Sequence, residues 1–260
     1  MKSKKISLYC QIGGAIDMAE FAINGPYGAL TNSGLEPEEI DLTFICWKTP
    51  PHTYEWLHKN NFKYVDMEYD EGKGFLWNLY KGWNLGYEVG LESADYVCPI
   101  ATDHAFYKDW LKNMLSFAQP NRIVCGKLIE PGLLPSLHTT VNLGPTIEGQ
   151  FLAREFEMIC AHLSKDELVF DDTGYYHEDG GIGGAYGRRL DSMPFIVPAD
   201  VWAKHGPMKQ ILNEFGITGD TDFFDRCKFA GVEITKALNS ISYHCGGAET
   251  MRNRAMGVYT

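Results

Sequence analysis

The chain has 260 residues, 45% of them hydrophobic, and is long enough to bury a substantial core as one large or two small domains. Its 23 Lys and Arg against 34 Asp and Glu give a formal net charge of −11, which disfavours binding to nucleic acid or to an anionic membrane surface. The seven cysteines form no C-x-x-C pair, which argues against a disulfide framework and a structural zinc site. No apolar run has the length of a signal-peptide core or a membrane span, so we expect a cytoplasmic protein.

The first half of the sequence alternates between two kinds of pattern. Short apolar runs bounded by polar residues predict buried strands, and longer segments with apolar residues three or four positions apart predict helices. The predicted strands cover residues 5–12, 41–48, 62–69, 95–100 and 121–129. The predicted helices cover residues 15–30, with an interruption at Gly25-Pro26, and residues 52–60, 74–90 and 107–118. This alternation predicts an α/β fold with a mostly parallel central sheet that helices cover on both faces.

The second half of the sequence is less regular. A polar connection follows Pro131, and a glycine-dense stretch at 171–189 has neither a G-x-G-x-x-G pattern after a strand nor the lysine of a Walker motif. No internal repeat and no Pro- or Ser-rich linker marks a boundary, so we expect a single domain over residues 1–260. The predicted elements are helices at 149–164 and 199–206, a strand at 193–198, and a helix running into a strand at 216–234.

The first candidate site lies where the predicted strand 95–100 ends. Asp103 follows that strand, with Thr102 before it and His104 after it. Ligands of parallel sheets bind beyond the carboxyl ends of the strands, and a carboxylate beside another oxygen or nitrogen ligand can hold a hard divalent cation. The segment is therefore a candidate for Mg²⁺ or Mn²⁺ bound to a diphosphate. The alternative is structural, because Thr and Asp commonly cap the N-terminus of a helix.

The second candidate site is the acidic pair Asp220 and Asp222 in "GDTDFFDR". Two carboxylates near the start of a helix can divide the work, one accepting a proton from a reacting hydroxyl and the other positioning ligands. The alternative is again structural. Acidic residues favour the positive end of a helix dipole, and Arg226 lies four positions after Asp222, the spacing of an ion pair on one helix face.

Two further candidates lie near the end of the sequence. His244 follows an alternating run and precedes two glycines, so we expect its imidazole at the end of a strand, where it can ligate a metal or serve as a structural group. Arg252 belongs to a polar, cationic segment that can either fold over phosphates or remain in solvent.

The order of these features along the chain resembles the family 2 glycosyltransferases of the GT-A fold. "ATDHAFYKDWL" is similar to the family's metal-binding segment, with Asp103 in register with its last acid and Thr102 where Asn or Asp is usual. "GDTDFFDR" is similar to the family's Glu-Asp-x-Asp-x-x-x-Arg motif, with Gly219 in place of the Glu. "ISYHCGG" is similar to the later strand whose His can complete the metal site, and "WNLYKGWNLGYEVG" to the helix that approaches the donor.

The resemblance implies transfer of a sugar from a nucleotide sugar, expected to be a UDP- or GDP-sugar, to an acceptor hydroxyl. It implies Asp103 and His244 as ligands of Mn²⁺ or Mg²⁺. It also implies Asp220 as the base and Asp222 as the second acid, and hence a single displacement with inversion. Residues 1–130 would form the donor-binding half and residues 131–260 the acceptor-binding half. The residues expected to bind the nucleotide sugar are Gly13, Gly14, Asn78, Lys81, Asn84, Thr102, Arg226 and Arg252.

Two other functions remain open at this point. The same sheet and metal site could serve a sugar-phosphate nucleotidyltransferase, although Gly13 and Gly14 have no cationic residue beside them of the kind that such enzymes use. The third possibility is a non-catalytic carbohydrate-binding or interaction domain of the same fold. The acceptor and the oligomeric state, including a homo-oligomer, are open, and nucleic acid is disfavoured as a partner unless Lys108, Lys112 and Arg122 form a basic patch.

Overall fold

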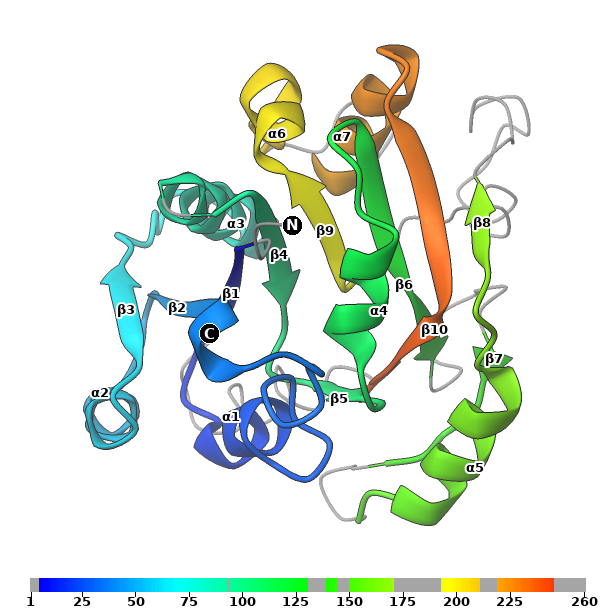
Figure 1. The fold of residues 1–260 in the computed structure, drawn as a ribbon. Coiled ribbons are helices and arrows are strands. Elements are labelled where there is room, and N and C mark those ends of the chain that lie inside the picture. Colours follow the sequence, from blue (N-terminus) through cyan, green and yellow to red (C-terminus); the bar gives the residue numbers. More distant parts are fainter. Residues whose placement is uncertain are drawn as a thin grey trace.

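The computed structural model describes residues 5–92, 94–130, 139–144, 150–170, 193–210 and 219–245. These residues form a mixed α/β fold in which helices flank a curled, mostly parallel sheet (Figure 1). Within the described ranges the sheet has ten strands, eight of which follow one another in the order β3-β2-β1-β4-β9-β6-β10-β5. The predicted fold class is confirmed.

The first four strands of the sheet are parallel neighbours. They are β1 (Ile6–Ile12), β2 (Ile40–Cys46), β3 (Lys63–Asp66) and β4 (Tyr96–Ile100). Three of them lie within runs that the sequence predicts as strands, although β3 ends earlier than expected, and β2 begins one residue before its predicted run. Strand β1 lies between β2 and β4 and is almost entirely buried, in keeping with its continuous apolar run.

A single antiparallel strand, β9 (Phe195–Pro198), joins this part of the sheet to the rest, because it pairs with β4 on one side and β6 (Arg122–Glu130) on the other. Since β9 is antiparallel to both neighbours, β6 runs in the same direction as β4, and so does β10 (Glu233–His244), which is parallel to β6. The carboxyl ends of the parallel strands therefore lie at one edge of the sheet. The remaining strands are β5 (His104–Phe106), β7 (Thr139–Thr140) and β8 (Leu168–Phe170).

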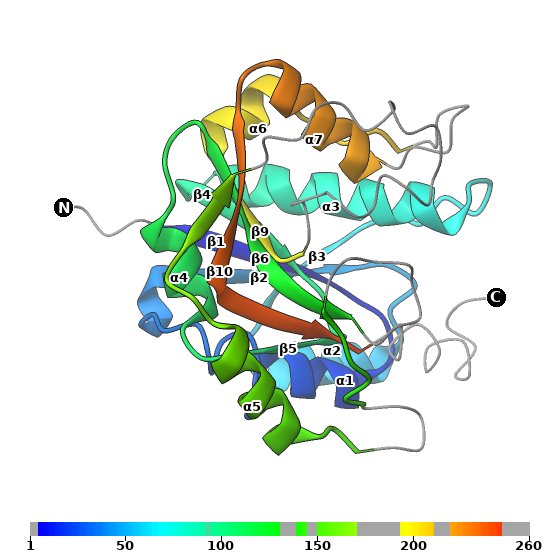
Figure 2. The same cartoon turned by 90° about the vertical axis from the view of Figure 1, so that its right-hand side faces the viewer.

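Helices cover both faces of the sheet (Figure 2). Successive residues of β1 point to opposite faces, so that Leu8 and Cys10 pack with α1, α2 and α4 while Tyr9 packs with α3, α6 and α7. None of the helices in the described ranges is long and apolar enough to cross a membrane. The helices are α1 (Ile16–Ile23), α2 (Pro51–Lys59), α3 (Phe75–Leu91), α4 (Trp110–Ser116), α5 (Ala153–Leu163), α6 (Ala199–His205) and α7 (Gly219–Phe229), with a 3₁₀ turn, η1, at Pro37–Glu39.

Candidate active site

Asp103 lies in the turn between β4 and the short strand β5, at the edge where the parallel strands end. It does not cap a helix, because β5 follows it directly and α4 begins only at Trp110. The capping alternative is therefore wrong for Asp103. Strand β5 runs antiparallel to the end of β10, and His104 is the register partner of His244. This pairing brings Asp103 to His244 across 141 positions of sequence.

The Asp103 carboxylate lies between two imidazoles. Its Oδ2 is 3.2 Å from Nε2 of His244, and its Oδ1 is 3.1 Å from Nδ1 of His104. The two imidazole rings stack, with centroids 5.0 Å apart and planes at 21°. The backbone of Asp103 is also fixed, since its carbonyl accepts a hydrogen bond of 2.7 Å from the N–H of Cys245. The structure thus brings together Asp103 and His244, the two residues that the resemblance implies as metal ligands.

Burial alone would raise the pKa of Asp103, whose side chain is only 13% exposed. The charge of His244 and the hydrogen bonds from His104 and His244 act in the opposite direction and prevail, holding the pKa of this carboxyl well below its usual range. Asp103 is therefore an ionised carboxylate at neutral pH, the protonation state that a metal ligand requires.

Asp103 and His244 offer a carboxylate oxygen and an imidazole nitrogen, donor types that a divalent cation can accept. In the described ranges no group of three or more His, Cys, Asp and Glu side chains is arranged to hold a metal ion by itself. Two ligands at about 2.1 Å from one cation, at a right angle, lie about 3.0 Å apart, close to the 3.2 Å between the Asp103 and His244 donor atoms. Mg²⁺ usually takes one or two carboxylates and completes its shell with phosphate oxygens and water.

Thr102, Gly13 and Gly14 lie beside Asp103 at the same sheet edge, because β1 and β4 are parallel neighbours and all three residues follow the ends of these strands. Thr102 is 4% exposed. The carbonyl oxygens of the two glycines face α2, where Gly13 accepts a hydrogen bond of 3.0 Å from Thr53 and Gly14 lies 3.2 Å from Nε2 of His52. Helix α2 thus fixes the turn after β1.

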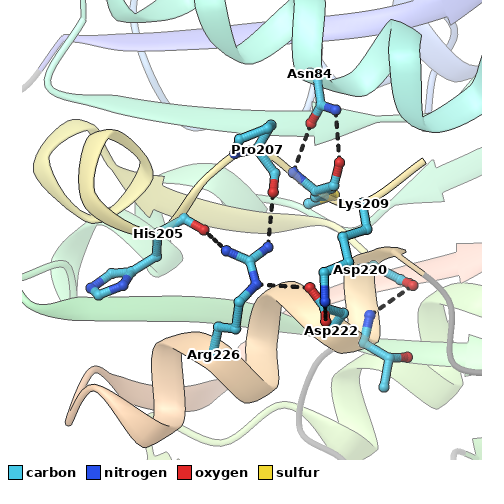
Figure 3. A network of polar contacts seen from close by, with 9 residues as sticks. Asn84, His205, Pro207, Lys209, Asp220, Asp222 and Arg226 are labelled. Atoms are coloured by element: carbon cyan, nitrogen blue, oxygen red, sulfur yellow. Dashed lines mark hydrogen bonds and ion pairs between the residues drawn. The ribbon is translucent and has the colours of Figure 1, made fainter. Parts of the chain in front are cut away.

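Asp220 and Asp222 begin helix α7 and belong to a different set of contacts (Figure 3). Oδ1 of Asp220 accepts hydrogen bonds from the hydroxyl of Tyr80, at 2.8 Å, and from the N–H of Thr221, at 2.9 Å. Asp222 binds Nζ of Lys209 at 2.5 Å and Nε of Arg226 at 2.7 Å. The ion pair between Asp222 and Arg226, expected from their spacing, is confirmed.

Arg226 is engaged by the backbone as well as by Asp222. Its guanidinium also donates hydrogen bonds to the carbonyl oxygens of His205 and, at 2.8 Å, Pro207 (Figure 3). Asn84 of α3 contacts the next residue, Met208, through two hydrogen bonds of 2.9 Å that pair its amide with the backbone N–H and C=O. Arg226 and Asn84 therefore hold the segment after α6 from two sides.

The other expected donor-binding residues of α3 also bind backbone. The amide of Asn78, which is fully buried, exchanges hydrogen bonds of 2.9 and 3.1 Å with the backbone of Asp70. Lys81 donates a hydrogen bond of 2.5 Å to the carbonyl oxygen of Glu68. Both side chains thus fix the connection between β3 and α3. Arg252 lies outside the described residues.

Polar and aromatic residues outside the set of expected site residues also gather at this sheet edge. Gln11 of β1 accepts a hydrogen bond of 2.7 Å from Nε1 of Trp47, which follows β2. The Trp47 ring stacks on Tyr69, with centroids 5.3 Å apart and planes at 12°, and the ammonium of Lys48 lies 4.2 Å from the Tyr69 ring centroid. The Trp47-Lys48 pair at a strand end is visible in the sequence. The sequence does not indicate, however, that Tyr69 packs against both side chains.

Sequence comparison finds no matching family model and no matching curated protein. Structural comparison finds the S. aureus glycosyltransferase TarS, in a crystal structure of its residues 1–349, with a TM-score of 0.56 at 12% sequence identity. The likeness shows that the chain shares the α/β fold of this structure. The match covers 95% of the present chain and 62% of the TarS chain, so the present chain spans less than two thirds of that structure.

Proposed function

We propose that the protein is a metal-dependent glycosyltransferase of the family 2 type, which transfers a sugar from a nucleotide sugar to an acceptor hydroxyl. The observation that supports this proposal most directly is the contact between Asp103 and His244, 3.2 Å apart at the carboxyl edge of the parallel strands, in a fold shared with a glycosyltransferase. This edge is where α/β sheets bind their ligands.

Asp103 and His244 would hold Mn²⁺ or Mg²⁺. When bound, such a cation stabilises the negative charge that builds on the departing nucleoside diphosphate. Asp103 contributes a carboxylate that stays ionised, and His104 keeps its second oxygen oriented. His244 would offer its Nε2, which must be deprotonated to ligate a metal.

Asp220 would act as the base. Its carboxylate accepts the proton of the acceptor hydroxyl while the hydroxyl oxygen attacks the anomeric carbon and the bond to the diphosphate breaks, so that one displacement inverts that centre. The hydrogen bonds from Tyr80 and from the backbone of Thr221 fix the orientation of this carboxylate. Asp222 and Arg226, joined to each other and to the segment after α6, would hold the start of α7 in position.

The proposal is tested by screening UDP- and GDP-sugars with Mn²⁺ or Mg²⁺ and measuring the nucleotide released. We expect release of the nucleoside diphosphate, its loss on chelation of the metal, and its return on metal addition. Asp220→Asn should reduce transfer by about 10²-fold or more, because the base is lost, while nucleotide sugar still raises the melting temperature as in the wild type.

The outcomes of this screen separate the candidate functions. Release of pyrophosphate from a nucleoside triphosphate and a sugar phosphate would instead identify a nucleotidyltransferase. Binding of sugars without turnover would identify a carbohydrate-binding domain. Equal loss of transfer and donor binding in Asp220→Asn would remove Asp220 from the role of base.

A further inference from the structure

The start of helix α7 has no room for a side chain at Gly219. A Cβ atom there would overlap the carbonyl oxygen of Lys209 and would lie 3.1 Å from Cδ1 of Tyr80. The space beside Asp220 is therefore occupied by the ring of Tyr80, which comes from helix α3. The acid that precedes Asp220 in the resembled motif has no counterpart here, and a phenol from another helix lies at this place.

Tyr80 is held firmly in this position. It is only 4% exposed, and its ring packs edge to face on Trp83, with centroids 5.6 Å apart and planes at 84°. Its hydroxyl donates a hydrogen bond of 2.8 Å to Oδ1 of Asp220, the oxygen that also accepts the N–H of Thr221. This oxygen therefore accepts two hydrogen bonds, one from the hydroxyl of a buried tyrosine and one from the backbone of α7. Together they fix the rotation of the carboxylate.

We propose that Tyr80 is the positioning residue of Asp220, a role that rests on the proposed function. Its hydroxyl orients the carboxylate toward the acceptor, so that the proton is accepted in the geometry in which the hydroxyl attacks. A misoriented carboxylate would slow the reaction, because the rate depends on the alignment of reacting groups to within a fraction of an ångström. In this role Tyr80 acts on Asp220 and not on the substrate.

The test is Tyr80→Phe, which removes the hydroxyl and keeps the ring. We expect kcat for transfer to fall by about tenfold or more, since a hydrogen bond to a charged group is lost at the reacting centre. KM for the nucleotide sugar should stay within about twofold, and the melting temperature within a few degrees, of the wild-type values. Incorporation of 3-fluorotyrosine at position 80, which restores both ring and hydroxyl, should restore kcat.

The matched control is Tyr87→Phe. Tyr87 lies on the same helix and is fully buried, and its ring packs on Tyr9 and Trp202, so kcat should not change. If wild-type enzyme transfers sugar and Tyr80→Phe keeps its full kcat per folded molecule, the inference is overturned and the proposed function stands. A fall in melting temperature with unchanged kcat would make Tyr80 a structural link between α3 and α7. Absence of transfer in the wild type with every donor would instead overturn the proposed function.

Discussion

At the scale of single residues, Asp103 is the most constrained side chain of the candidate site. Removing a carboxylate from water is unfavourable unless hydrogen bonds and opposite charge compensate. Both oxygens of Asp103 have such compensation, from His244 on one side and His104 on the other. A buried carboxylate held in this way links the ends of β4 and β10.

The depressed pKa of Asp103 makes a prediction about stability and pH. A carboxyl whose folded pKa is lower than its unfolded value of about 3.9 stabilises the protein above that pH, and the contribution is lost as the pH falls through the folded pKa. In the presence of a chelator, Asp103→Asn should lower the free energy of unfolding by about 2 kcal/mol at pH 7. Urea unfolding of both proteins between pH 7 and 3 should show this difference shrinking below about pH 4. A difference that stays constant over this range would contradict the compensation described here.

At the scale of elements, the segment between α6 and α7 is held by side chains from two helices. Asn84 of α3 and Arg226 of α7 bind consecutive backbone groups of this segment, at Met208 and Pro207. Figure 3 shows the two side chains approaching the segment from opposite directions. The first turn of α7, which carries Asp220 and Asp222, is also joined to α3 directly, by the hydrogen bond from Tyr80 to Asp220.

Asn84→Ala tests this link. The substitution leaves a buried N–H and C=O of Met208 without their partners, so we expect a loss of about 2–3 kcal/mol in the free energy of unfolding. Asn121→Ala is the control, since Asn121 is exposed and its amide donates one hydrogen bond, to Gly231, and should cost less than about 1 kcal/mol. Donor affinity, measured on folded protein, should be the same in Asn84→Ala and wild type if Asn84 acts through the backbone. A large loss of donor affinity with little change in stability would instead place the amide in the nucleotide site.

Sequence patterns predict the helices and strands of this fold better than they predict which strands pair with each other. The apolar runs that become β1, β2, β4 and β6 are long enough to be recognised, as is the run of β9. Periodicity does not say that β9 is inserted antiparallel between β4 and β6, because that depends on tertiary packing. Strand β5 has only three residues, and its sequence reads as the approach to the following helix.

The same contrast holds for the candidate site, where positions at strand ends are predictable and contacts between helices are not. Asp103 and His244 are predictable from their places at strand ends, since parallel strands end at one edge of a sheet. The contact between Tyr80 and Asp220 joins residues 140 positions apart on two helices and depends on the absence of a side chain at Gly219. Such a contact has no periodic signal. The roles of all the candidate site residues remain predictions.

At the scale of the whole molecule, no disulfide links the parts of the core within the described residues. The largest buried clusters lie on opposite faces of the sheet and share β1, β4 and β6, so each helical layer is stabilised by packing on the same strands. All seven cysteines are buried and none forms a disulfide; five lie in these two clusters, and Cys160 and Cys245 lie in a third. Burial raises the pKa of the Cys46 and Cys227 thiols to about 12. The cysteines therefore behave as small apolar core residues.

This distribution predicts the accessibility of the thiols. A thiol reacts as its thiolate, and a buried thiol with a raised pKa is both inaccessible and protonated, so a thiol reagent at pH 8 should label the native protein only as fast as it unfolds locally or globally. In denaturant all seven should react at once. Glu55→Cys, at an exposed position of α2, is the positive control and should add a single fast phase under native conditions. A fast phase in the unsubstituted native protein would mean that part of the core opens readily, and the cysteine labelled would identify which helical layer separates from the sheet.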